Sequence, residues 1–197
     1  MQHSKEAKVR ISPVLVGLMG SGKSSIGRRL APCLKVPLVD LDDYIVAKDG
    51  RSIADIFKQD GEAFFRQLET RCLREVLGQH AVIATGGGVV LLEENRQLLI
   101  AHPPVIWLHA SPKFLAKRIV GDSNRPLVAG KKSLAETLKC LQELADVRYP
   151  LYEGCADYVL PRGDMRKPEA LNSILVFLEQ WMLKHPNSST VTTQVIP

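Results

Sequence analysis

The sequence has few cysteines, and they form no recognisable site. Four occur among 197 residues, far apart and with no CxxC pair or neighbouring histidine cluster, at Cys33, Cys72, Cys140 and Cys155. This spacing indicates neither a zinc site nor a disulfide framework, and it fits a reducing cytoplasm.

Long apolar runs are also absent. No stretch approaches the ~18 uninterrupted apolar residues of a membrane span. The N-terminal segment MQHSKEAKVR lacks the apolar core of a secretion signal. We therefore expect a cytoplasmic protein without membrane contact.

A strong excess of one charge is missing too. Lys and Arg number 26 and Asp and Glu 21, a net charge of +5 that leaves a nucleic acid, a membrane surface or a small phosphate compound open as partner. The length and the 45% hydrophobic content suit one globular domain. We expect that domain to cover residues 13–185, with flexible polar tails at residues 1–12 and 186–197.

Short apolar runs alternate with helical patterns along the chain. Helix-capping signals occur at Ser52, Ser111 and Ser133, the first of which opens a short helix expected to run through Phe57. A further helix is expected from near Pro168 to before Pro186. The predicted strands are almost wholly apolar, as in parallel sheets buried on both faces: Val14–Leu18, Leu38–Leu41, Ala81–Ala84, Val105–Leu108 and Tyr158–Leu160. The pattern predicts an α/β fold with ligands bound at the carboxyl ends of the strands.

A phosphate-binding motif follows the first predicted strand. Residues 17–24, GLMGSGKS, fit GxxxxGK[ST] in full. Gly20 and Gly22 can adopt positive φ, which lets backbone N–H groups surround a phosphate at the start of a helix. Lys23 can reach the β- and γ-phosphates, and the Ser24 hydroxyl can ligate Mg²⁺. The motif predicts a nucleotide site.

Two aspartates follow the second predicted strand. If Leu38–Leu41 is a strand, Asp40 and Asp42 point to the same side and could hold Mg²⁺ through water or accept a hydroxyl proton. Helix capping by Asp42 or Asp43 is an equally good interpretation of the same spacing.

Further candidates are less specific on their own. Three glycines, Gly86–Gly88, indicate close approach of a ligand or backbone, or else a flexible turn. Arg66 and Arg148 could grip carboxylate or phosphate, although single arginines usually lie on the solvated surface. The segment 120–132, with Arg125 near its centre, is either a lid that brings a cation to transferring phosphate or a surface loop.

Taken together, these motifs resemble the shikimate kinase family. The resemblance covers about Val14 to Leu183 and is carried by GLMGSGKSSIGRRLA, Asp40-Leu41-Asp42, SIADIF with Gly61-Glu62 and Phe65-Arg66, TGGGVV, Asn124–Leu127 and Arg148–Tyr152. It implies the nucleoside-monophosphate-kinase type of P-loop fold, a three-layer α/β/α structure with a five-stranded parallel sheet. It also implies a substrate-binding helical segment at about 42–70 and a lid at about 120–132.

The resemblance implies transfer of the γ-phosphoryl of ATP, with Mg²⁺, to the 3-hydroxyl of shikimate, a step in aromatic amino-acid synthesis. The implied catalytic residues are Lys23, Asp42 and Arg125, and Ser24 and Asp40 would hold Mg²⁺, the latter through water. The implied substrate contacts are Asp42, Arg66, Gly86, Gly87, Gly88 and Arg148. The implied ATP contacts are Gly20, Ser21, Gly22, Lys23, Ser24, Ser25, Arg118, Arg125, Arg166 and Pro168.

Two other functions are compatible with parts of this pattern. Gluconate kinase has a similar phosphate loop, but Arg66, Arg148 and TGGG favour a ring carboxylate over a linear sugar acid. An inactive sensor module would be expected to lack catalytic residues or to carry a DNA-binding domain, for which Met1–Ser12 is too short. We therefore expect a monomeric enzyme whose partner is a small molecule, with no nucleic acid and no membrane.

Overall fold

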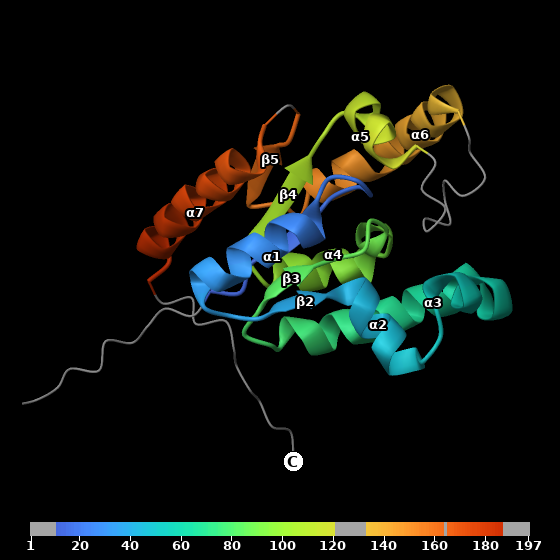
Figure 1. Ribbon diagram of the computed structural model, residues 1–197. Coiled ribbons are helices and arrows are strands. Elements are labelled where there is room, and N and C mark those ends of the chain that lie inside the picture. The colour runs from blue at the N-terminus through green and yellow to red at the C-terminus, as the bar shows by residue number, and fades with distance from the viewer. Residues whose placement is uncertain (1–10, 121–132, 164, 187–197) are drawn as a thin grey trace, which may run out of the picture.

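In the computed structural model, which describes residues 11–120, 133–163 and 165–186, a parallel sheet forms the middle layer. Its strands lie in the order β2-β3-β1-β4-β5 (Figure 1). Their bounds are β1 Val14–Val16, β2 Leu38–Asp40, β3 Val82–Ala84, β4 Val105–His109 and β5 Tyr158–Pro161. In the sheet, β2 and β3 lie on one side of β1, and β4 and β5 lie on the other. The carboxyl end of β1 therefore lies at the point where ligands bind in such sheets.

Helices cover both faces of the sheet (Figure 1). They are α1 Lys23–Leu34, α2 Leu41–Asp49, α3 Ile53–Leu77, α4 Glu93–Ile100, α5 Pro112–Ile119, α6 Leu134–Glu153 and α7 Lys167–Lys184, with a 3-10 turn η1 at Val89–Leu91. Successive strand residues point to opposite faces. Leu15 and Ile106 thus pack with α1 and α7, whereas Val14 and Val105 pack with α3 and α6. Burial on both faces explains why the strands are apolar throughout.

The predicted fold and capping signals are confirmed. Ser52, Ser111 and Ser133 each accept a hydrogen bond from a backbone N–H in the first turn of α3, α5 and α6. The helix expected from near Pro168 is α7, which begins at Lys167. The boundaries differ by one or two residues, because β1 ends at Val16 and β5 extends to Pro161.

Two expectations about the region after β2 are wrong in detail. Leu41 is the first residue of α2, so the strand ends at Asp40 and strand alternation does not set the direction of Asp42. The helix that starts after Ser52 runs to Leu77, well beyond Phe57, with a break at Gly61, where φ is 80° and ψ is 175°. Glycine tolerates this left-handed φ, which lets one helix continue into another at a new angle.

Parts of the domain description fall outside the structure. Ile11 and Ser12, which we placed in the N-terminal tail, are buried. Residues 1–10, 121–132 and 187–197 lie outside the described residues, so the remaining tail segments and nearly all of the lid with Arg125 do as well. None of the helices in the described ranges is long and apolar enough to cross a membrane.

Candidate active site

The loop between β1 and α1 has the backbone that the glycine pattern predicts. Gly20 has a φ of 80° and Gly22 a φ of 99°, both in the left-handed region. Gly22 directly precedes α1, which has no side-chain cap at that end. The N–H groups of the first turn of α1 and the positive end of its dipole therefore serve an anion in front of the loop.

Lys23 lies at this loop and is largely buried. Its Nζ donates to the carbonyl oxygens of Gly17 at 2.7 Å and Leu18 at 3.2 Å. Only 8% of the residue is exposed. The fold thus holds a positive charge at the loop, where it would stabilise negative charge on a phosphoryl group.

Ser24 and Asp40 contact each other in the cleft beside the phosphate loop. The Ser24 hydroxyl donates to Oδ2 of Asp40 at 2.6 Å, which joins α1 to the end of β2. Oδ1 of Asp40 accepts from the backbone N–H of Asp42 at 3.2 Å. Asp40 is therefore the N-cap of α2, and the capping assigned to Asp42 or Asp43 is wrong. One carboxylate both starts a helix and contacts the hydroxyl of the phosphate motif.

This pair of oxygen donors suits Mg²⁺, which binds proteins through one or two oxygen ligands and otherwise keeps water and substrate phosphates. Among the residues with described positions, no group of three or more His, Cys, Asp or Glu side chains could hold a metal by itself. A magnesium ion here would therefore depend on the nucleotide for much of its coordination.

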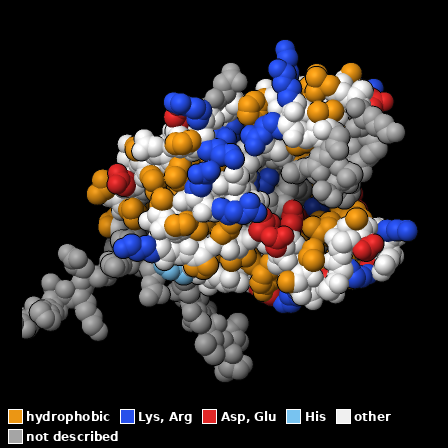
Figure 2. All heavy atoms as spheres, in the orientation of Figure 1, with side chains coloured by type: hydrophobic (Ala, Val, Ile, Leu, Met, Phe, Trp, Pro, Cys, Tyr) orange, Lys and Arg blue, Asp and Glu red, His pale blue; other side chains and the backbone are white. Residues whose placement is uncertain are grey.

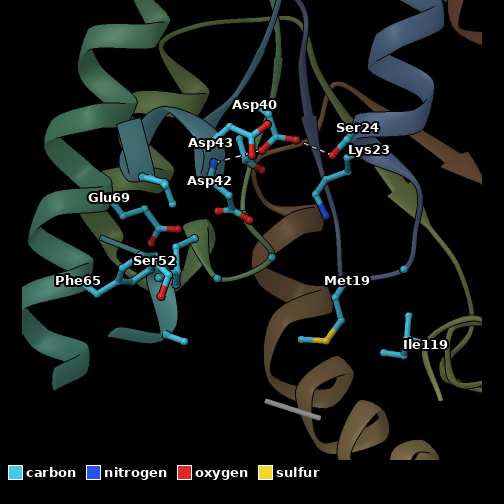
Figure 3. A pocket seen from close by; sticks show the side chains of 18 of the residues that line it. Met19, Lys23, Ser24, Asp40, Asp42, Asp43, Ser52, Phe65, Glu69 and Ile119 are labelled. Atoms are coloured by element: carbon cyan, nitrogen blue, oxygen red, sulfur yellow. Dashed lines mark hydrogen bonds between the residues drawn. The ribbon is translucent and has the colours of Figure 1, made fainter. Parts of the chain in front are cut away.

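Asp42 reaches into the cleft next to residues Gly86–Gly88, which follow β3 and are called the glycine loop below. Figure 3 shows Asp42 from α2 and Lys23 from α1 pointing into the same space. A Cβ on Gly86 would lie 2.7 Å from Oδ1 of Asp42, so only glycine lets this carboxylate approach the backbone so closely. The prediction of a close approach at Gly86–Gly88 is thereby confirmed over the flexible turn.

Arg66 is held over the same loop by an acid that the sequence analysis missed. Its Nη1 donates to Oε2 of Glu69 at 2.7 Å, and a Cβ on Gly88 would lie 2.4 Å from Nη1. Glu69 is 1% exposed, and this burial raises its pKa while Arg66 opposes the rise. A spacing of three on a helix is the signal that pairs these two residues, because such side chains lie on one face.

Arg148 approaches the glycine loop from α6, which lies between β4 and β5 in the chain, whereas Arg66 belongs to α3, which precedes β3. It is 5% exposed, and its Nη1 donates to the carbonyl oxygen of Gly87 at 2.9 Å. Burial is the main cause that lowers its pKa, and the charge of Arg66 lowers it further. An arginine stays protonated even so. We call the two guanidinium groups the positive wall. Arg66 is already paired with Glu62 and Glu69, so an anionic ligand would mainly relieve the charge of Arg148.

These elements border one cleft of about 1260 Å³. In Figure 2, acidic side chains lie at a hollow that is bordered by Lys and Arg side chains over α1. The cleft brings together most of the predicted residues. Its lining includes Gly20, Gly22, Lys23, Ser24, Ser25, Asp40, Asp42, Arg66, Gly86, Gly87, Gly88, Arg118 and Arg148.

Four predicted ATP contacts stand apart from this lining. Ser21 is fully buried within the loop, and Arg125 lies outside the described residues. Arg166 forms an exposed ion pair with Glu169 at 2.6 Å, and Pro168 is exposed on the first turn of α7. The structure therefore does not bring Arg166 and Pro168 to the cleft. Arg118, by contrast, borders the cleft with its guanidinium 5.4 Å from the centre of the Phe114 ring.

A second missed residue supports the phosphate loop from behind. Arg162 is 2% exposed, and its Nε donates to the carbonyl oxygen of Ser21 at 3.4 Å. Its Nη1 donates to the carbonyl oxygen of Met165. Burial lowers its pKa, and the nearby Arg118 adds to this. Only the fold brings this residue to the loop, 141 positions from Ser21, so no local motif could have indicated it.

A parallel α/β sheet, a phosphate loop after β1 and a positive wall across the cleft define a P-loop kinase that acts on a small acidic substrate. Comparison with known proteins makes the assignment specific. The family model described as shikimate kinase matches residues 19–179. This chain belongs to the shikimate kinase family, and it is an ATP-dependent phosphotransferase.

Individual relatives agree with this membership. A shikimate kinase of Enterococcus faecalis (strain ATCC 700802 / V583) is 43% identical over 171 residues, which cover 86% of this chain and 99% of the relative. A solved shikimate kinase of Acinetobacter baumannii in complex with shikimate is 31% identical, covers 91% of this chain and 97% of its own, and superposes with a TM-score of 0.77. A gluconokinase of Sinorhizobium meliloti, 17% identical with a TM-score of 0.53, shares the fold alone.

Proposed function

We propose that this cleft transfers the γ-phosphoryl group of ATP to the 3-hydroxyl of shikimate, giving shikimate 3-phosphate and ADP. Family membership supports the reaction, and one observation in the structure supports the acceptor. Arg66 and Arg148 converge on the glycine loop beside Asp42, in the cleft that the phosphate loop also borders. A ring that carries a carboxylate at one end and hydroxyls at the other fits that separation of charges.

The nucleotide would bind with its phosphates at the loop 17–22 and the first turn of α1. Lys23 would stabilise charge on the transferred group, and Arg118, which also lines the cleft, would contact adenine. Arg125, from the segment 121–132, would add a second cation to the transferred group. Arg166 and Pro168 would need to approach the cleft to contact adenine, because they lie outside its lining here.

Ser24 and Asp40 would hold the magnesium ion that accompanies ATP. The ion neutralises charge on the phosphates when it is bound. The 2.6 Å hydrogen bond between the two side chains keeps both oxygen ligands side by side in the cleft lining.

Asp42 would accept the hydrogen bond of the attacking hydroxyl. Its backbone N–H donates to Asp40 at the start of α2, which fixes the backbone position from which the Asp42 side chain extends. The hydroxyl oxygen then forms the new bond to phosphorus as the bond to the ADP oxygen breaks. Asp42 orients that oxygen and is placed to take its proton.

Arg66 and Arg148 would bind the carboxylate of shikimate. Both are pre-positioned, Arg66 by Glu69 and Arg148 by the carbonyl oxygen of Gly87. Fixed donors of this kind lose little side-chain freedom when the substrate binds. The monomeric state and the cytoplasmic location expected above remain predictions.

The test is an assay of ADP release by the full-length chain with ATP, Mg²⁺ and shikimate, gluconate or no acceptor. We expect release with shikimate alone, and proton NMR of the product should show phosphate on the 3-oxygen. The variant Lys23→Ala, purified in the same way, controls for contaminating kinases and should be inactive. Release with gluconate but not with shikimate would refute the assignment.

A further inference from the structure

The carbonyl oxygen of Gly87 accepts two hydrogen bonds from α6. Arg148 Nη1 donates to this oxygen at 2.9 Å, and the hydroxyl of Tyr152 donates to it at 2.6 Å. The two donors are four residues apart, so they lie on the same face of the helix. Both lone pairs of this oxygen are therefore used by groups that reach it over more than 60 positions of sequence.

The Tyr152 hydroxyl is a fixed donor. The residue is fully buried, and its ring stacks on Trp107 of β4 with the ring centres 5.7 Å apart. Burial raises its pKa, so the hydroxyl keeps its proton across the working range of the enzyme. A fully buried ring that stacks in this way gives its hydroxyl a single direction.

Fixing this carbonyl has consequences on both sides of it. The same peptide unit carries the N–H of Gly88, whose direction is set once the C=O is held, because the peptide is planar. Gly88 lies under the guanidinium of Arg66. On the other side, the carbonyl engages one N–H of Arg148 and so limits how its guanidinium can rotate. One oxygen thereby links the two arginines of the positive wall.

We propose that Tyr152 is a positioning residue for recognition of the substrate carboxylate. Its hydroxyl holds the Gly87 carbonyl, and that carbonyl holds Arg148 and the Gly87–Gly88 peptide in the orientation that the carboxylate requires. This inference rests on the proposed function, because it concerns the same arginine site. It adds a fully buried residue that is not part of the cleft lining.

The test is Tyr152→Phe, which removes only the hydroxyl and keeps the buried ring. The matched control is Tyr149→Phe, on the same helix, whose hydroxyl donates to the carbonyl oxygen of Ala110. Each protein is assayed with shikimate and with its methyl ester, in which the carboxylate charge is gone. Thermal unfolding of both variants checks that they fold.

We expect Tyr152→Phe to raise the KM for shikimate about 3- to 10-fold, the usual effect of one lost hydrogen bond. The KM for the ester, the KM for ATP and kcat should stay close to those of the wild type. Tyr149→Phe should leave the ratio of ester KM to acid KM unchanged. A lower ratio in Tyr152→Phe alone supports the inference, because a general loss of packing would move both substrates together.

The other outcomes separate two failures. If the wild type uses shikimate and its ester equally well, arginine recognition of the carboxylate is wrong, and the proposed acceptor site fails with it. If the wild type prefers the acid and Tyr152→Phe keeps the same preference, the inference about Tyr152 is wrong by itself. An equal rise of both KM values in Tyr152→Phe overturns it as well.

Discussion

The glycine at position 88 allows the arrangement at Arg66 to be tested by adding one methyl group. Gly88 has φ −101° and ψ −2°, a conformation that alanine adopts readily, so Gly88→Ala brings no backbone strain. The new Cβ would lie 2.4 Å from Nη1, 2.5 Å from Nη2 and 2.7 Å from Cζ of Arg66. Non-bonded carbon and nitrogen prefer about 3.5 Å, so the guanidinium has to move by about 1 Å.

This displacement should weaken substrate binding more than folding. Arg66 is a long side chain whose end can move without disturbing the backbone of α3. The 2.7 Å bond to Oε2 of Glu69 and the bond to the substrate carboxylate, however, depend on the exact place of that end. Hydrogen bonds to charged groups contribute about 1.5–3 kcal/mol, so partial loss of this order predicts a rise of about 10- to 100-fold in the KM for shikimate.

The measurement is initial-rate ADP release with shikimate varied at saturating ATP, followed by ATP varied at saturating shikimate. Gly78→Ala is the control, because Gly78 also has a helical backbone, with φ −73°, and its Cβ would meet Glu75 at an ordinary 3.5 Å. A KM for shikimate within about twofold of the wild type would refute the placement of Arg66 as a carboxylate ligand. So would an equal rise in the KM for ATP.

Two further predictions concern buried charges. Because burial raises the pKa of Glu69 above its usual 4.5, the folded chain binds more protons than the unfolded chain just above that pH. The free energy of unfolding of the wild type should therefore fall, relative to Glu69→Gln, as the pH rises through this range, and urea unfolding at stepped pH measures it. Parallel curves would contradict the raised pKa. Arg162→Met removes the donor to the Ser21 carbonyl and should raise the KM for ATP about 3- to 10-fold while the KM for shikimate stays constant. A change in the KM for shikimate of the same size would show a general disturbance instead.

The sequence predicted best what depends on neighbouring residues. The phosphate loop is such a case, because Gly20 and Gly22 have the positive φ that their position in the motif requires. The N-caps Ser52, Ser111 and Ser133 are others, since a cap bonds to a backbone N–H only a few residues away. Element boundaries were less accurate where a polar residue serves two elements. Asp40 ends β2, caps α2 and contacts Ser24, and the strand pattern, which continued to Leu41, indicated none of these.

The residues that hold the site in place could not be predicted in the same way. Glu69 and Arg162 do not belong to any of the motifs named above, and Tyr152 ends the segment Arg148–Tyr152 without a role that the sequence assigns to it. Tyr152 and Arg162 act on carbonyl oxygens that lie 65 and 141 positions away, so their roles exist only after the sheet order is known. Side chains that contact a ligand share recurring patterns, whereas side chains that support them depend on the particular packing of the fold.

Burial explains why a net charge of only +5 is enough for a site that binds two anions. Arg148 and Arg162 are 5% and 2% exposed, and within the described residues neither forms an ion pair with a carboxylate. Burial lowers the pKa of each, which means that holding these charges costs stability before ligands bind. In that setting a charge is screened little by solvent, and an arriving anion gains more from it than from a surface lysine. The buried guanidinium groups of Arg148 in the cleft lining and of Arg162 behind the phosphate loop therefore do more for binding than the overall excess of basic residues.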